Sequence, residues 1–264
     1  MRPFFLITLL ALGCPQTEPV DQSCEGLFGA PSENTGLSES QCDPICHCGD
    51  SIWQPPSISE ETIASFEAAT LLDGPEPLTE DPYSVTPDAT ADEAAFCSIL
   101  RAEPGSTSYR LLTTGSEALA TEAGASITHK GACGLCSSLQ NLAVYLRNRD
   151  LTDPVRECGL QGMFEGEQAN IDCLMAIGFD LPCAQIWYYN THHTRQACLE
   201  PCLAALEDPH HNPDGSLNDC IQCDEDQSGA VFKAVAGRTR RNSGLASALC
   251  RPCDSVYQVS HDAF

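Results

Sequence analysis

Residues 136–148 read CSSLQNLAVYLRN and carry the clearest helical pattern in the chain. Apolar side chains recur there at the three- and four-residue spacing that places them on one face of an α-helix. That face consists of Leu135, Leu139, Leu142, Ala143 and Leu146. Arg147 follows at the C-terminal end, where the helix dipole favours a cation. We therefore expect this helix to lie against the core of the protein.

Weaker patterns elsewhere complete the predicted fold. The sequences SISE and TADE are capping boxes, which are typical of helix N-termini. Helices are predicted at residues 57–73, 90–105, 166–177 and from Leu181 onward, after a cap at Asp180 with Pro182 in the first turn. Strands are predicted at residues 109–113, 229–237 and 255–260. Together these elements predict a mainly α fold with a small β element.

Seventeen cysteines in 264 residues indicate an oxidising compartment and a disulfide-rich secreted domain. Setting Cys14 aside leaves sixteen, an even number that can form up to eight disulfides. Three C-x-x-C pairs leave alternatives open, namely a zinc site for the last two pairs or a redox couple for the first. These pairs are Cys133/Cys136, Cys220/Cys223 and Cys250/Cys253.

The N-terminus reads MRPFFLITLLALGC, with Arg2 before an apolar stretch that is too short to span a bilayer. This pattern predicts a signal peptide over residues 1–13. The segment LALGC resembles the cleavage site of bacterial lipoproteins, although Ala11 stands where that class usually has Leu. The resemblance implies that Cys14 becomes the lipidated first residue of a bacterial envelope protein, held to the membrane through this lipid only. The alternative is a plain signal peptide cut near Gly13.

Composition divides the rest of the chain into four parts. Residues 14–56 are rich in Ser, Glu, Pro and Gly and predict a flexible, cysteine-containing tether after the lipidated cysteine. The helical segment 57–73 is followed by a proline-rich linker, 74–88. A disulfide-stapled globular domain is expected over residues 89–264. Four cysteines precede the linker, apart from Cys14, and twelve follow it, so we expect each side to pair internally.

The charge of the chain restricts its partners. Thirteen Lys and Arg against 37 Asp and Glu give a formal net charge of −24. Binding to a nucleic acid requires a dense basic surface, and adsorption to anionic lipid requires a basic patch. We therefore expect no nucleic-acid partner and no lipid contact beyond the anchor.

Three arginines within four positions stand out against this acidic background. Arg238, Arg240 and Arg241 are followed by Asn242 and Ser243. We expect Asn242 or Ser243 to cap a helix that runs to Cys250, and guanidinium groups beside such a cap would bind a carboxylate, sulfate or phosphate. The alternative is that the arginines neutralise the protein's own acids at residues 224–226.

Residues 131–137, GACGLCS, resemble the segment around the nucleophile of papain-like proteases. The resemblance implies that Cys136 is the nucleophile, with Cys133 in a disulfide and His261 downstream. The match covers seven residues. Lys130 and Ser137 depart from the family's pattern, and no Asn follows His261.

Histidines and carboxylates offer weak candidates for a metal site. His210 and His211 lie near Asp208 and Asp214, a set that suits zinc or copper. Residues 224–229, DEDQSG, begin like a calcium loop, but position twelve is Val235 instead of Glu. We expect solvated loop histidines and a turn before a strand at these sites. No cofactor is therefore predicted, with zinc and calcium as the alternatives.

Together these patterns favour an exported, lipid-anchored protein with a non-enzymatic role, which binds a small anion or a protein partner. The alternative is an exported hydrolase that uses a metal bound by the His210 and His211 region or the thiol of Cys136.

Overall fold

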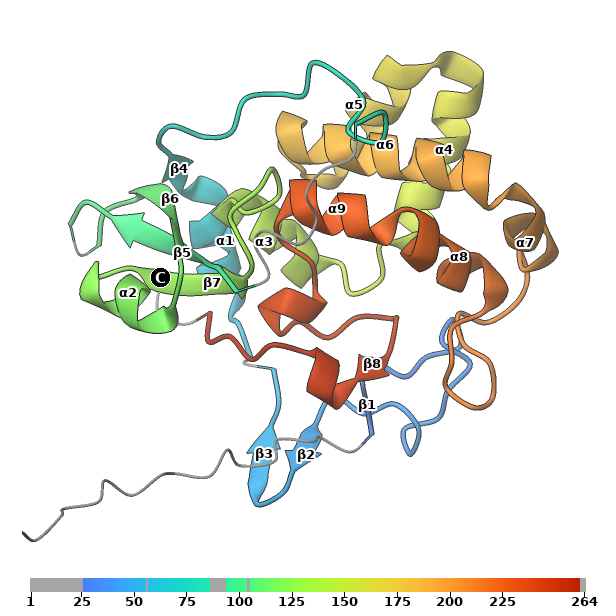
Figure 1. The fold of residues 1–264 in the computed structure, drawn as a ribbon, viewed down its shortest axis with the longest axis horizontal. Coiled ribbons are helices and arrows are strands. Elements are labelled where there is room, and N and C mark those ends of the chain that lie inside the picture. The colour runs from blue at the N-terminus through green and yellow to red at the C-terminus, as the bar shows by residue number, and fades with distance from the viewer. Residues whose placement is uncertain (1–25, 56, 86–93, 104, 262–264) are drawn as a thin grey trace, which may run out of the picture.

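The computed structural model describes residues 26–55, 57–85, 94–103 and 105–261. A sheet lies on one side of the molecule and a group of helices on the other, with a small β-hairpin below them (Figure 1). The predicted signal peptide and Cys14 lie outside the described residues. Within those residues no helix has the length and the apolar character needed to cross a bilayer.

The main sheet has four strands in the order β4-β6-β5-β7. The first pair, β4 and β6, is parallel, whereas β5 pairs antiparallel with both β6 and β7. The short helix α2, Glu117–Glu122, lies between β6 and β7 in the sequence. The strands are β4 Thr70–Leu71, β5 Phe96–Arg101, β6 Ser108–Thr114 and β7 Ser126–Lys130.

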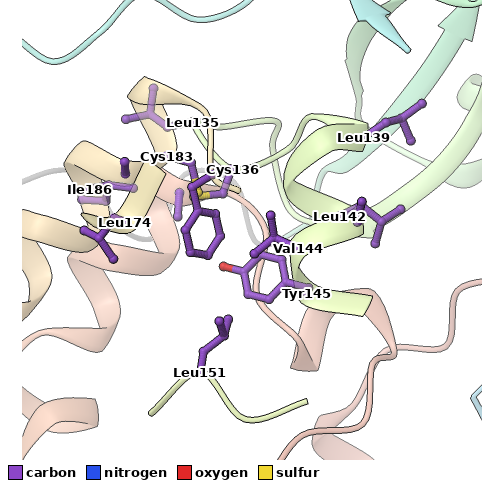
Figure 2. Packing of buried hydrophobic residues seen from close by; sticks show 14 of the residues in the cluster. Leu135, Cys136, Leu139, Leu142, Val144, Tyr145, Leu151, Leu174, Cys183 and Ile186 are labelled. Carbon is purple, nitrogen blue, oxygen red and sulfur yellow. A yellow bond between two sulfur atoms is a disulfide. The ribbon is translucent and has the colours of Figure 1, made fainter. Parts of the chain in front are cut away.

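The predicted central helix is confirmed as α3, Leu139–Arg147, with Ser138 as its N-cap. The figure shows Leu139 and Leu142 on one side of this helix and Val144 and Tyr145 on the other (Figure 2). Helix α3 is therefore buried on two sides, which is a wider apolar surface than the single predicted face. The helix α1, Glu60–Ala68, packs against it, and both belong to one core.

Six further helices surround this core. Helices α5 and α6 confirm the predictions at 166–177 and after Asp180, whose side chain accepts a hydrogen bond from the backbone N–H of Cys183. Helix α4 was not predicted. The helices are α4 Thr152–Glu165, α5 Glu167–Ile177, α6 Leu181–Ala197, α7 Leu199–Ala204, α8 Asp219–Gln227 and α9 Gly229–Ala236.

Two predicted elements have the opposite type of secondary structure. The predicted helix at 90–105 is in its described part the strand β5, because pairing with β6 and β7 on both edges outweighs local propensity. The predicted strand at 229–237 is helix α9, since a short apolar run does not distinguish a strand from a buried helix. No strand forms over residues 255–260. The fold is thus mixed α and β and disulfide-rich.

Seven disulfides join the described cysteines, and Cys48 is also disulfide-bonded. Five of them hold the helices and the sheet together: Cys97–Cys133, Cys136–Cys183, Cys158–Cys173, Cys198–Cys223 and Cys202–Cys220. The other two are Cys42–Cys250 and Cys46–Cys253. In none of the three C-x-x-C pairs are the two cysteines bonded to each other. All six cysteines form disulfides with other partners, so no free thiols remain for a zinc site or a redox couple, and these two alternatives are wrong.

The segment predicted as a flexible tether is instead attached to the C-terminal region. Cys42–Cys250 and Cys46–Cys253 cross the predicted linker, which contradicts internal pairing on each side. The strand β1, Leu27–Phe28, pairs antiparallel with β8, Arg251–Pro252. The hairpin of β2, Cys46–Cys48, and β3, Ser51–Trp53, extends this contact, and the rings of Phe28 and Trp53 lie 4.3 Å apart.

The proline-rich linker is also docked over its described part, residues 74–85. The backbone N–H of Leu78 donates to Oε1 of Gln185 at 2.7 Å. The hydroxyl of Tyr83 donates to Oδ1 of Asn190 at 2.7 Å, and its ring stacks on that of His193. Segments 57–73 and 74–85 therefore pack on the same core as the predicted globular domain.

The two long-range disulfides close nearly the same loop, with sequence separations of 208 and 207. Removing either one alone leaves that loop closed by the other. We expect each pair of Cys→Ser substitutions to cost about 1 kcal/mol, and both pairs together about 3–5 kcal/mol, in urea unfolding.

The control is the Cys158–Cys173 disulfide, which closes its own loop with a separation of 15. The free-energy cost of removing it is expected to add to the cost of removing either long-range disulfide, without coupling between the two. Simple additivity of the two long-range pairs would contradict the prediction.

Candidate functional site

Arg238, the first of the three clustered arginines, is fully buried, with 0% exposure. Its Nε donates to the carbonyl of Cys136, and its two Nη atoms donate to the carbonyls of Thr128 and Ser137 at 3.0–3.1 Å. The hydroxyl oxygens of Thr128 and Ser243 accept two more hydrogen bonds. Burial lowers the pKa of Arg238 to about 10. Because every donor direction points into the protein, the prediction that Arg238 binds an outside anion is wrong.

The guanidinium of Arg240 is likewise hydrogen-bonded to other groups of the protein. Its guanidinium donates to the carbonyls of Tyr145, Ala246 and Asn148 and lies over the ring of Tyr145. These contacts place a cation at the C-terminal end of α3, where carbonyl groups lack helical partners. The side chain of Arg241 is half-buried.

The expected helix cap is replaced by a buried polar loop. Residues Arg241–Ser243 form one turn of 3₁₀ helix, and no helix runs from there to Cys250. The amide of Asn242 donates to the carbonyls of Lys130 and Gly237, both at 2.7 Å. The alternative pairing with residues 224–226 is not formed by these arginines either, since Glu225 pairs with Arg251.

Cys136 is not a nucleophile, because its sulfur is bonded to Cys183 (Figure 2). The GACGLCS segment has a structural explanation. A Cβ on Gly134 would lie 2.4 Å from the carbonyl oxygen of Val235, so only glycine allows this close approach to α9. The backbone N–H of Cys136 then donates to the carbonyl of Ala236 at 2.8 Å.

His129 and Ser137 form a hydrogen-bonded pair, with Nε2 and Oγ 2.7 Å apart. Nδ1 of His129 must donate to the carbonyl of Lys130, so Nε2 accepts the hydroxyl proton of Ser137. Burial holds the pKa of His129 well below its ordinary value. Both side chains are fully buried, so this pair belongs to the polar interior around Arg238.

The candidate metal ligands point to different partners. Nε2 of His210 lies 3.6 Å from Oδ2 of Asp150, whereas Nε2 of His211 donates to the carbonyl of Cys250. Asp214 accepts hydrogen bonds from Ser216, and Asp208 is exposed. Among the described residues no group of three or more His, Cys, Asp or Glu side chains converges as a metal site would require. The two histidines are buried, not solvated as expected.

The calcium-like segment, 224–229, is not a loop, because it covers the last turn of helix α8 and the first residue of α9, joined at Ser228. Burial raises the pKa of Asp224, whose carboxylate accepts from Thr194 and Asn190 of α6. Ser228 is hydrogen-bonded to Nδ1 of His193 and to Thr194. This network joins α8 to α6, and its polar groups are already hydrogen-bonded to other groups of the protein.

Surface hollows in the described part of the chain include two of moderate volume. One, of about 310 Å³, is lined by Glu67, Gln140, Val144 and Arg147. The other, of about 510 Å³, lies where the N-terminal segment meets the loop after α7, and it includes Gln41, Asp208 and His211. Both are wide open to solvent. Neither gathers the predicted site residues into one group.

The most exposed large apolar side chain among the described residues is on helix α4, and a second exposed apolar run, Leu199, Leu203 and Leu206, lies on and just after α7. Leu160, Met163 and Phe164 are 50%, 54% and 86% exposed. Their i, i+3 and i+4 spacing places them on one stripe of the helix, which we call the α4 face. A phenylalanine that is almost fully exposed on a well-formed helix is typical of a contact surface. This face was missed because the sequence analysis predicted no helix over residues 152–165.

The comparisons with known proteins add one finding. A family model described as a family of unknown function (DUF8771) matches residues 167–259, which extend from α5 past β8. The matched segment contains Arg238 and Arg240 but begins just after the α4 face. No curated protein and no solved structure matches the chain.

The role of Arg238 can be tested by Arg238→Lys. Lysine keeps the charge but cannot direct donors to five acceptors at once. We expect the free energy of unfolding to fall by about 1.5–3 kcal/mol, the range for hydrogen bonds to a charged group. The matched control is Arg241→Lys, expected to change stability by less than about 0.5 kcal/mol. Equal urea midpoints for Arg238→Lys and the unmodified chain would contradict this role.

Asp150 gives a pH-dependent prediction. The His210 ring, then Asn34 and the backbone N–H of Thr152, lower the pKa of Asp150 below its ordinary value of 3.8. The resulting stabilisation is fully present above pH 3.8 and is lost as the pH falls below it. We expect Asp150→Asn to lower stability by about 1.5–3 kcal/mol at pH 7 and to approach the unmodified chain under strong acid.

Thermal melts across pH 2–7 measure this difference, with Asp208→Asn as the exposed neighbouring control. If the difference in melting temperature between Asp150→Asn and the unmodified chain stays constant over that pH range, the ionised carboxylate is not the cause of the stabilisation.

Proposed function

We propose that this chain is an exported, lipid-anchored envelope protein with a non-enzymatic role, which binds a protein partner through the α4 face. The observation that carries the proposal is the exposure of Phe164 and its two apolar neighbours on one helical stripe.

Export is supported by the disulfides, since seven of them in one fold are typical of an oxidising compartment. Lipid anchoring at Cys14 and a bacterial envelope are supported by the signal-peptide pattern and by the odd cysteine count.

Of the two ligand classes that the sequence suggested, the contacts favour a protein partner. The donors of Arg238 and Arg240 are occupied by backbone carbonyls and hydroxyls, which leaves them few directions for an anion. Phe and Met, two of the three exposed side chains on this rigid helix, are residue types enriched at protein interfaces.

A photo-crosslinking experiment in the native host tests both parts. The full-length chain would carry p-benzoylphenylalanine in place of Phe164. We expect a discrete adduct with one protein in the membrane fraction, which disappears when Leu160→Asp is added to the same chain. Placing the probe at Ile52, an apolar residue that is 68% exposed on β3, serves as the matched control and should not give this adduct.

Adding Cys14→Ser is expected to move the chain and its adduct into the soluble fraction. Retention in the membrane would contradict the anchor. Absence of an adduct from position 164, or an identical adduct from position 52, would contradict the binding role.

A further inference from the structure

Resting on the proposed function, we infer that the α4 face binds a basic, amphipathic segment of the partner protein. The apolar side of that segment would cover Leu160, Met163 and Phe164, and its Lys or Arg side chains would meet the carboxylates around them.

The α4 face is held in place before any partner arrives. Helices α4 and α5 form a hairpin whose two arms are joined by Cys158–Cys173. Gly162 lies directly against Asn170, since a Cβ at this glycine would be 2.6 Å from the Cβ of that asparagine. The packed side of α4 is thereby fixed against α5, and the apolar stripe points away from it. A surface that is already ordered loses little conformational entropy on binding.

The rim of this stripe is strongly acidic. Helices α4 and α5 together contain one basic residue and five acidic residues. The basic residue, Arg156, already lies 3.2 Å from Oδ1 of Asp153. The other acids are exposed: Glu157, Glu165, Glu167 and Asp172. Arg195 of α6 also lies here and donates to the carbonyl of Gly159, but the acids still outnumber the bases, so the local field attracts cationic side chains and repels anionic ones.

An aromatic side chain lies next to this rim. Burial and the nearby carboxylate of Glu167, the first residue of α5, raise the pKa of Tyr188 on α6. Tyr188 in turn lies against Tyr189 and His192, with ring centroids 5.1 and 5.8 Å away. Half-buried aromatic groups beside carboxylates can stack on guanidinium groups or on the methylene stems of lysine.

The same charges disfavour the two other occupants of an exposed apolar face. A second copy of the chain would bring another net charge of −24 to the interface. An anionic lipid surface would be repelled in the same way. Since an acidic rim around Met and Phe side chains suits a basic helix, the partner's contact segment is assigned to that class.

The experiment uses the exported Cys14→Ser chain and labelled synthetic peptides of about 18 residues, the length of five helical turns. The first peptide has an amphipathic Leu/Lys pattern. The second replaces every Lys with Glu, and the third has the Leu/Lys composition in an order that gives no apolar face. Fluorescence anisotropy at low and high salt measures the affinity. We expect only the first peptide to bind, more weakly at high salt.

Phe164→Ser is expected to weaken binding of the Leu/Lys peptide by about tenfold or more, which corresponds to about 1.4 kcal/mol. Ile52→Ser is the matched control and should leave affinity unchanged, and both variants should melt like the parent chain. Glu165→Lys with Glu167→Lys should weaken binding and reduce its salt dependence.

Several outcomes would overturn the inference: binding of the Leu/Glu peptide, equal binding of the peptide with the scrambled order, or no effect of Phe164→Ser. Association with anionic vesicles, or a dimer that Phe164→Ser disrupts, would assign the face to lipid or to a second copy. If the crosslink at position 164 forms but no Leu/Lys peptide binds, the partner chemistry is wrong and the proposed function stands. Peptide binding without a cellular crosslink would contradict the proposed function alone.

Discussion

The buried guanidinium of Arg238 joins the C-terminal loop to two neighbouring segments that lie more than 100 positions earlier in the sequence. Its hydrogen bonds reach Thr128 in β7, Cys136 and Ser137 before α3, and Ser243 in the C-terminal loop. A buried charge is costly unless its donors are satisfied, and here carbonyl and hydroxyl oxygens satisfy all of them. Those carbonyls would in turn lack partners without the arginine. This one side chain therefore links the sheet, the segment before the central helix and the C-terminal loop.

The disulfides act on a different scale from this polar centre. Cys158–Cys173 closes a short loop and fixes two neighbouring helices. Cys42–Cys250 and Cys46–Cys253 instead join the N-terminal segment to residues more than 200 positions away. That segment has few large apolar residues and would not bury enough surface to stay folded on its own. The two long-range disulfides therefore hold this segment against the rest of the fold, whereas α3 is held by burial of its apolar side chains.

Sequence reasoning identified what local pattern determines. Helix α3 and the cap at Asp180 follow from apolar spacing and from capping chemistry within a few residues. Cysteine parity indicates how many disulfides can form but not their partners, and the contact between Cys42 and Cys250 depends on the tertiary fold. The partners of Arg238 are backbone carbonyls about 100 residues away, for which the sequence has no signal. Phe164 shows a further limit, because it lies on helix α4, which the sequence analysis did not predict.

The inward placement of the arginines also determines the character of the surface. Arg238 and Arg240 donate to carbonyls, and Arg147 and Arg251 pair with glutamates. The chain has thirteen Lys and Arg in all, and the two inward-pointing arginines, Arg238 and Arg240, add little positive charge to the outer surface. The outside is then more uniformly acidic than the composition alone suggests. An apolar stripe on such an outside selects its partner by charge as well as by shape, since Phe164 provides contact area and the surrounding carboxylates exclude acidic competitors.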